Sequence, residues 1–193
     1  MNEFEECVAR GGVALFPADT VYGLATNAES AEGVRRLYEI KGRPQDRPAA
    51  VMFFRLDDAL GALPELGPRT REALERLLPG PVTLILPNPE RRFPLACGPA
   101  PERLGLRVPD VPALAEVRTP VLQSSANPSG GADVRRLADV DPGIRARVDL
   151  EIDGGELPGT PSTVVDLTDY ESGGVYSVLR EGALDPEALR SLG

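Results

Sequence analysis

Residues 11–48 read GGVALFPADTVYGLATNAESAEGVRRLYEIKGRPQDRP, and this stretch decides the fold. The apolar run at 13–16 stands between a pair of glycines and Pro17, which is the pattern of a short buried strand. A segment that is first polar and then apolar, 19–24, follows just past the carboxyl end of that strand. The sequence therefore predicts a strand that leads into a polar turn.

A helix is predicted after the turn. Ser30 can cap it, and its apolar residues Val34, Leu37 and Tyr38 recur at helical spacing. The glycine and proline of the sequence KGRP (41–44) end the helix in a basic loop. Strand, polar turn, helix and basic loop in one unit predict a site for an anion.

Lys41 is the only lysine in a chain with 21 basic residues. A lysine ammonium suits a phosphate oxygen as a point charge, whereas arginine binds as a rigid fork. Lys41 is therefore a candidate phosphate ligand, although a surface lysine without a role would leave the same pattern.

The composition limits the class of protein and its chemistry. A chain of 193 residues with 41% hydrophobic and 26% charged residues predicts one well-cored domain, residues 1–193. The sequence has no histidine, which excludes Ser-His-Asp and Cys-His nucleophilic sites and histidine-ligated zinc. Its net charge of -9 argues against broad, non-specific nucleic-acid binding, which needs a basic face. Cys7 and Cys97 are too few and too far apart in sequence to indicate a disulfide or metal framework.

The sequence also predicts where the protein acts. No apolar run approaches the ~20 residues that span a bilayer, so we expect no membrane segment. The N-terminal residues MNEFEECVAR are acidic and amphipathic, unlike a secretory signal. We therefore expect a cytoplasmic protein.

Strands and helices alternate through the first two thirds of the chain. Apolar runs and period-two patterns predict strands at 13–16, 49–54, 82–86, 104–109, 120–122, 148–153, 162–167 and 175–179, with 148–153 exposed or at an edge. Helical spacing and caps predict helices at 2–10, 30–41, 57–63, 70–78, 111–117, 133–137 and 185–192. The alternation favours an α/β fold with a twisted mixed sheet and flanking helices.

Polar residues follow or interrupt two of these strands. Arg107 lies inside the apolar strand at 104–109, and arginine is rarely buried without a partner. An inter-strand salt bridge and a guanidinium directed at a substrate carboxylate both explain it. At 123–131 the sequence QSSANPSGG can offer hydroxyls and backbone N–H groups to an anion, although such runs are usually plain turns.

Seven segments together resemble the YrdC family and come in the family's order. They are PADTVYGL (17–24), KGRP (41–44), PGPVTLIL (79–86), LGLRVP (104–109), SSANPSG (124–130), STVVDL (162–167) and VLREG (178–182). Each is weak alone, but the ordered set is specific and covers nearly the whole chain. The resemblance implies a YrdC-like fold, in which a twisted mixed sheet and its flanking helices surround a concave active-site cleft.

Members of this family are threonylcarbamoyl-AMP synthases. The resemblance implies that L-threonine, bicarbonate and ATP give threonylcarbamoyl-adenylate and pyrophosphate, with Mg²⁺ carried by the ATP and no metal site of the protein's own. The product supplies the threonylcarbamoyl group for the adenosine beside the anticodon of certain tRNAs. Transfer to tRNA belongs to partner proteins, and a weak contact of this chain with RNA stays open.

The resemblance also implies roles for particular residues. The lysine-x-arginine pair of the family corresponds to Lys41 and Arg43, which are expected to be catalytic. The expected ATP-binding residues are Lys41, Arg43, Arg47, Ser125 and Asn127 and, nearer the nucleotide, Arg103, Asp133 and Arg180. The expected threonine-binding residues are Thr20, Arg107, Gln123 and Ser162.

The sequence departs from the family pattern near the expected threonine pocket. Ala18 stands where the family usually has threonine, and Gln123 where small residues or proline are common. Met52 stands where some relatives carry histidine. These departures concern details of the pocket more than the reaction.

Two alternatives stay open. One is a nucleotide- or RNA-binding module of the same fold without synthase activity, against which the acidic balance and the intact Lys41 and Asn127 motifs argue. The other is a carbamoyl-adenylate former of the kind embedded in larger maturation proteins. Those proteins use carbamoyl phosphate and need further domains that are not found in these 193 residues.

Overall fold

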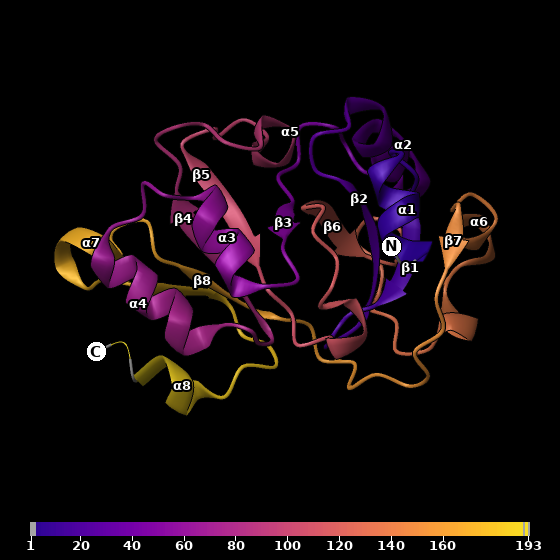
Figure 1. Ribbon diagram of the computed structural model, residues 1–193. Coiled ribbons are helices and arrows are strands. Elements are labelled where there is room, and N and C mark those ends of the chain that lie inside the picture. The colour runs from indigo at the N-terminus through magenta and orange to yellow at the C-terminus, as the bar shows by residue number, and fades with distance from the viewer. Residues whose placement is uncertain (1–2, 191, 193) are drawn as a thin grey trace.

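A mixed sheet of nine strands runs through residues 3–190 and 192, the part of the chain described in this computed structural model (Figure 1). In chain order the strands are β1 (Ala14–Pro17), β2 (Tyr22–Asn27), β3 (Ala50–Met52), β4 (Val82–Pro87), β5 (Arg103–Arg107), β6 (Val121–Ser125), β7 (Leu150–Glu151), β8 (Thr163–Asp166) and β9 (Ser177–Arg180). Across the sheet the order is β7-β1-β2-β6-β3-β5-β4-β8-β9. The pairs β1–β7, β3–β5 and β4–β8 are parallel and the other neighbours antiparallel, which confirms the predicted mixed sheet.

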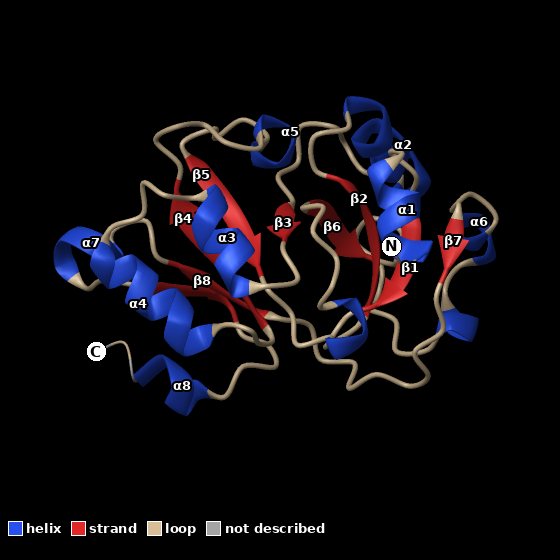
Figure 2. Ribbon diagram, in the orientation of Figure 1, coloured by secondary structure: helices blue, strands red, loops and turns tan. Residues whose placement is uncertain are grey.

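Helices flank this sheet (Figure 2). They are α1 (Glu3–Ala9), α2 (Ala31–Lys41), α3 (Leu56–Ala62), α4 (Pro68–Leu77), α5 (Pro94–Cys97), α6 (Pro142–Arg145), α7 (Tyr170–Gly173) and α8 (Pro186–Arg190), with the 3-10 turns η1 (Pro112–Leu114) and η2 (Leu137–Asp139). Helix α1 packs on β1, β2 and β7, α2 packs on β2, and α4 contacts α3, α7 and α8. None of the described helices is long and apolar enough to cross a membrane.

The alternation of side chains along β4 separates a buried face of the sheet from an open one. Val82, Leu84 and Leu86 are fully buried in the larger of two hydrophobic clusters. Thr83 and Ile85 point to the opposite face and are only half-buried. That open face is the floor of the cleft described below.

Helix α2 begins and ends where the sequence predicts. Ser30 Oγ accepts a hydrogen bond from the Gly33 N–H at 3.1 Å, and so caps the first turn. At the other end Gly42 adopts a left-handed conformation, with φ of 61°, and its N–H donates back to the carbonyls of Glu39 and Tyr38. This turn carries the chain into the basic loop after Lys41.

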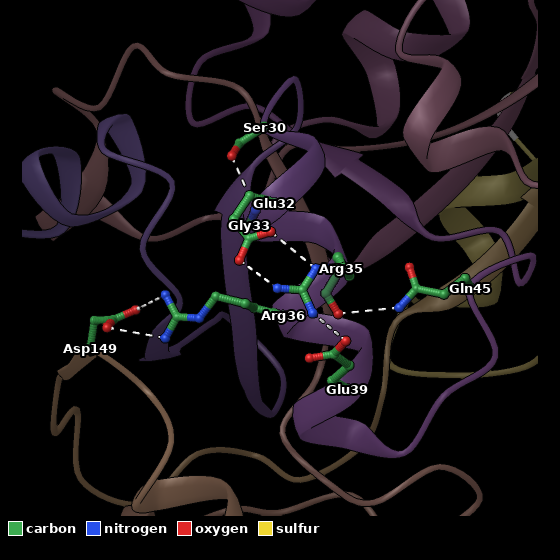
Figure 3. Close-up of polar contacts among 8 residues, drawn as sticks. All are labelled: Ser30, Glu32, Gly33, Arg35, Arg36, Glu39, Gln45 and Asp149. Carbon is green, nitrogen blue, oxygen red and sulfur yellow. Dashed lines mark hydrogen bonds and ion pairs between the residues drawn. The ribbon is translucent and has the colours of Figure 1, made fainter.

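The exposed side of α2 is held by ion pairs (Figure 3). Arg35 bridges Glu32 and Glu39 one turn to either side. Arg36 pairs with Asp149, just before β7, at 2.9 Å and so ties the helix to the edge of the sheet. The arginines on this side of α2 therefore have carboxylate partners.

Gly42→Ala is expected to lower the free energy of unfolding by about 1 kcal/mol, because an L side chain disfavours the left-handed conformation. A Cβ at Gly42 would meet nothing within 4 Å, so the cost is conformational and not steric. Urea unfolding measures it. Gly61→Ala is the matched control, since Gly61 lies in α3 with equal free space, and there the substitution should be stabilising. A gain in stability at Gly42 would contradict this account.

Several predicted elements need correction. The predicted helix at 133–137 is wrong, because tertiary hydrogen bonds hold that segment in an irregular path. The Val134 carbonyl accepts from the Tyr22 N–H and the Arg135 carbonyl from the Leu157 N–H, both at 2.9 Å. The helix predicted at 111–117 is reduced to η1.

The sequence predicts only a turn where strand β2 lies. Gly23, Ala25 and Asn27 have low strand propensity, and pairing with β1 on one side and β6 on the other determines their conformation. The sequence does not predict the short helices α5, α6 and α7. The ends of two predicted helices, at residues 2 and 191, lie outside the described residues.

Candidate active site

A cleft of about 290 Å³ lies on the open face of the sheet. Its floor is one row of neighbouring residues across four strands: Gln123 on β6 pairs with Ala50 on β3, which pairs with Gly105 on β5, which pairs with Ile85 on β4. Ala50 and Gly105, at the centre of the row, have small side chains and so leave room for the cleft above them. A Cβ at Gly105 would lie 3.3 Å from the Ala50 Cα, so the floor has little room for a larger side chain.

The cleft is positively charged within an acidic protein. Among its lining residues are Arg43, Arg107 and Arg180, against the single carboxylate of Asp133. The hydroxyls of Ser125 and Ser162 also line it. Convergent guanidinium and hydroxyl groups favour a ligand with carboxylate or phosphate oxygens.

Arg107 is buried, with only 3% of its surface exposed. Its guanidinium pairs with the Asp19 carboxylate and donates to Thr20 Oγ1 at 2.7 Å. This ion pair reaches the turn after β1 and not a neighbouring strand, so the inter-strand salt bridge considered above is not the one formed. Within the described residues, Arg107 Nε has no hydrogen-bond partner.

Arg107 remains positively charged although it is buried. Burial lowers the pKa of the guanidinium, and the nearby Asp19 carboxylate opposes that shift. An arginine keeps its proton at neutral pH in either case. Arg107 therefore contributes a fixed positive charge to the lining of the cleft.

Asp19→Ala is expected to lower the free energy of unfolding by about 3 kcal/mol, because it leaves Arg107 buried without its charged partner. Thermal or urea unfolding measures this loss. Glu187→Ala is the matched control, since the Glu187–Arg190 pair is exposed and its removal should change stability little. Equal losses of stability for the two substitutions would show that the buried Asp19–Arg107 pair stabilises the fold no more than an exposed pair does.

Arg43 lies at the rim of the cleft, in the loop after α2. It donates to the Pro48 carbonyl and, at 3.4 Å, to Ser124 Oγ. Its guanidinium carbon stands 5.5 Å from the centre of the Tyr38 ring, within range of a cation–π contact. Arg43 Nε is a second buried donor for which the described residues offer no partner.

Ser162 and Arg180 form the opposite wall. Arg180 donates to the Ser162 carbonyl at 2.7 Å, and Ser162 Oγ shares a hydrogen bond of 2.9 Å with Thr83 Oγ1. Ser162 is buried, so its hydroxyl is held in one place. This wall brings β4, β9 and the segment before β8 together.

Lys41, Ser125 and Asn127 form one hydrogen-bonded group at the end of α2. The Lys41 ammonium donates to the Ser125 carbonyl, to the Asn127 carbonyl at 2.7 Å and to Asn127 Oδ1 at 3.1 Å. The Ser125 hydroxyl donates to Asn127 Oδ1 at 2.7 Å. Of these residues only Ser125 lines the cleft.

The predicted site residues thus divide into two sets. Those that line the cleft are Arg43, Arg107, Gln123, Ser125, Asp133, Ser162 and Arg180. Those behind or beside it are Thr20, Lys41, Arg47, Arg103 and Asn127.

Arg47 and Arg103 do not line the cleft. Arg47 is exposed. Arg103 forms an ion pair with Asp166 and lines a smaller neighbouring cavity of about 210 Å³ together with Leu179.

The sequence interpretation missed three polar residues of the site. Asp19 precedes Thr20 in the PADTVYGL segment and is the charged partner of Arg107. Thr83 and Ser124 contact Ser162 and Arg43. The period-two pattern of β4 could have indicated Thr83, because it is a polar residue between buried ones.

Two of the three residues that depart from the family pattern, Met52 and Ala18, are buried in the hydrophobic core. Met52 is fully buried among Phe4, Phe16 and Phe54 in the smaller hydrophobic cluster. Ala18 is buried in the same cluster. Neither residue lines the cleft.

The fold and the cleft define an α/β protein with a site suited to anionic ligands. Residues 6–182 match the sequence model of the Sua5/YciO/YrdC family, which carries the description "Telomere recombination". The chain therefore belongs to this family, which confirms the resemblance seen in its motifs.

Curated and solved relatives extend the comparison. Threonylcarbamoyl-AMP synthase of Bacillus subtilis is 34% identical over 93% of this chain and 52% of its own. The crystal structure of Pyrococcus abyssi Sua5 complexed with L-threonine superposes with a TM-score of 0.86 at 29% identity, over 98% of this chain and 56% of that one. Escherichia coli YciO superposes with a TM-score of 0.80 at 28% identity, over 97% and 91%. The chain thus spans about half the length of the first two relatives.

Proposed function

We propose that this chain forms L-threonylcarbamoyladenylate and pyrophosphate from L-threonine, bicarbonate and ATP, for the threonylcarbamoyladenosine modification of tRNA. The observation that carries the proposal is that three arginines, Arg43, Arg107 and Arg180, line one cleft together with the hydroxyl-bearing Ser125 and Ser162. Family membership supports it, as do relatives named threonylcarbamoyl-AMP synthase. A solved relative that binds L-threonine supports the choice of amino acid.

The proposed reaction needs charge neutralisation more than acid–base chemistry. Threonine and bicarbonate first combine to a carbamate with loss of water. A carbamate oxygen then bonds to the α-phosphorus of ATP, and the bond from that phosphorus to the pyrophosphate oxygen breaks. An anion must thus approach a polyanionic triphosphate, so positioning and electrostatic stabilisation dominate. A chain without histidine can supply both with arginines and hydroxyls.

We assign the amino acid to the Arg107 side of the cleft. The Arg107 guanidinium would bind the threonine carboxylate, while Asp19 and Thr20 hold it in orientation. Ser162 and Gln123, which line the same cleft, would contact the rest of the amino acid.

We assign the triphosphate to the Arg43 side. Arg43 would bind phosphate oxygens, as would the Ser125 hydroxyl once it turned away from Asn127 Oδ1. Arg180 and Asp133 would lie toward the nucleoside. Mg²⁺ would enter as part of the nucleotide substrate and neutralise phosphate charge. Arg47 and Arg103 do not line the cleft, so they would contact only a part of the nucleotide that extends beyond it. Among the described residues, no group of three or more His, Cys, Asp or Glu side chains could hold a metal ion.

The cellular setting is part of the proposal. A cytoplasmic enzyme would pass the labile adenylate to proteins that transfer the threonylcarbamoyl group to tRNA. The net charge of -9 disfavours extensive RNA binding by this chain itself.

Product analysis tests the proposal. The protein is incubated with MgATP, threonine and ¹³C-bicarbonate. The products are then separated and their masses determined by mass spectrometry. The expected result is threonylcarbamoyl-adenylate that carries the label. Binding of ATP without labelled product would instead support the nucleotide-binding module without synthase activity.

A further inference from the structure

Lys41 is a buried lysine whose hydrogen bonds all remain inside the chain. It ends α2 and has 4% of its surface exposed. Its acceptors are the carbonyls of Ser125 and Asn127 and the Asn127 side-chain oxygen. An ammonium has three N–H donors, so these acceptors use all of them.

The loop at 125–131, which follows β6, also donates hydrogen bonds of its own. The Ser129 N–H donates to the Lys41 carbonyl at 2.9 Å. Asn127 Nδ2 donates to the Gly131 carbonyl and closes the far side of the loop. Lys41 thus binds the 125–131 loop through its main chain and its side chain.

We infer that Lys41 is a positioning residue, which fastens the 125–131 loop to the end of α2 and makes no contact with the nucleotide. This inference rests on the proposed function, because Ser125 of that loop is a proposed phosphate ligand. Arg43 follows Lys41 by two residues, so the same contact fixes both sides of the proposed phosphate site relative to each other. The single lysine of the chain is then explained by geometry: a flexible stem with three radial donors suits carbonyls that a planar guanidinium would not.

The contact depends on the charge of Lys41. A neutral amine has only two N–H donors for the three acceptors. The charged groups that face Lys41 are Arg43 and Asp133. Burial, reinforced by Arg43 and opposed by Asp133, lowers the pKa of Lys41 to about 8. The loop should therefore loosen as the pH rises through about 8.

The first test uses the unmodified protein and needs no activity. The amide resonance of Ser129 is followed by ¹H–¹⁵N NMR between pH 7 and pH 9.5, with the Gly33 amide, which donates to the Ser30 hydroxyl, as the internal control. We expect the Ser129 resonance to titrate with an apparent pKa near 8 and the Gly33 resonance not to. A Ser129 resonance that does not titrate would overturn the inference. Because this readout is structural, it can fail while the synthase assay succeeds, and the reverse.

The second test is a double-mutant cycle on the rate of pyrophosphate release. Lys41→Met and Asn127→Ala are each expected to lower kcat at saturating ATP, by roughly tenfold or more. With the loop already released by Lys41→Met, adding Asn127→Ala should cost less than about threefold. A double variant whose loss equals the product of the two single losses would indicate that Lys41 acts on the substrate independently, and would overturn the inference. Unchanged circular dichroism of each variant at the assay temperature is required for the comparison.

Discussion

Arg107→Ala is expected to raise the threonine concentration needed for half-maximal rate by roughly a hundredfold, with a much smaller effect on the ATP requirement. The reason is that this buried guanidinium lines the cleft and is the proposed donor to the threonine carboxylate. Loss of a buried, charge-assisted hydrogen bond of this kind costs about 3 kcal/mol, which corresponds to that factor. Steady-state kinetics with each substrate varied in turn measure it.

A second substitution at the same position separates binding from folding. Arg107→Ala also leaves Asp19 without its ion-pair partner, and so should lose stability. Arg107→Lys keeps a positive charge near Asp19, but it lacks the planar fork. We expect Arg107→Lys to fold with near-normal stability and still to require far more threonine. Equal increases in the threonine and ATP requirements for both variants would contradict the carboxylate-binding role.

Arg43→Ala is expected to lower kcat by about 10²–10³, because it removes a fixed positive charge from the proposed phosphate site. The guanidinium is held over the Tyr38 ring and near Ser124, so its position is preorganised before the substrate binds. The threonine requirement should change little. Pyrophosphate release at saturating substrates measures the effect.

Arg35→Ala is the matched control for Arg43. Arg35 lies on the exposed side of α2, pairs with Glu32 and Glu39, and does not line the cleft (Figure 3). Its removal should leave kcat within about a factor of two, since surface ion pairs contribute little. If Arg35→Ala and Arg43→Ala reduced the rate equally, the effect would reflect general loss of positive charge and not the site.

The elements that sequence could predict are those whose own residues determine them. Helix α2 carries its cap at Ser30, its apolar stripe and its terminal Gly42, so local chemistry determines both ends. Strand β4 lies in a short apolar run that follows a Pro-Gly-Pro break, so its own residues indicate it. Strand β2 and the segment at 133–137 could not be read in this way, because hydrogen bonds from distant strands and loops determine their conformation.

The same distinction applies to the candidate site. The sequence identifies Arg107 as an unusual residue within a strand, but its partner Asp19 lies 88 positions away. Likewise Lys41 meets Ser125 across 84 positions. The order of the family motifs identifies these residues as candidates. Only the folded chain distinguishes a side chain that lines the cleft from one that holds its neighbour in place.

The most direct test of the central claim is pyrophosphate release by this 193-residue chain alone, measured with each substrate omitted in turn. The account predicts release that requires ATP, threonine and bicarbonate together. Release that proceeds without threonine or without bicarbonate, or no release by a folded protein that binds ATP, would contradict it.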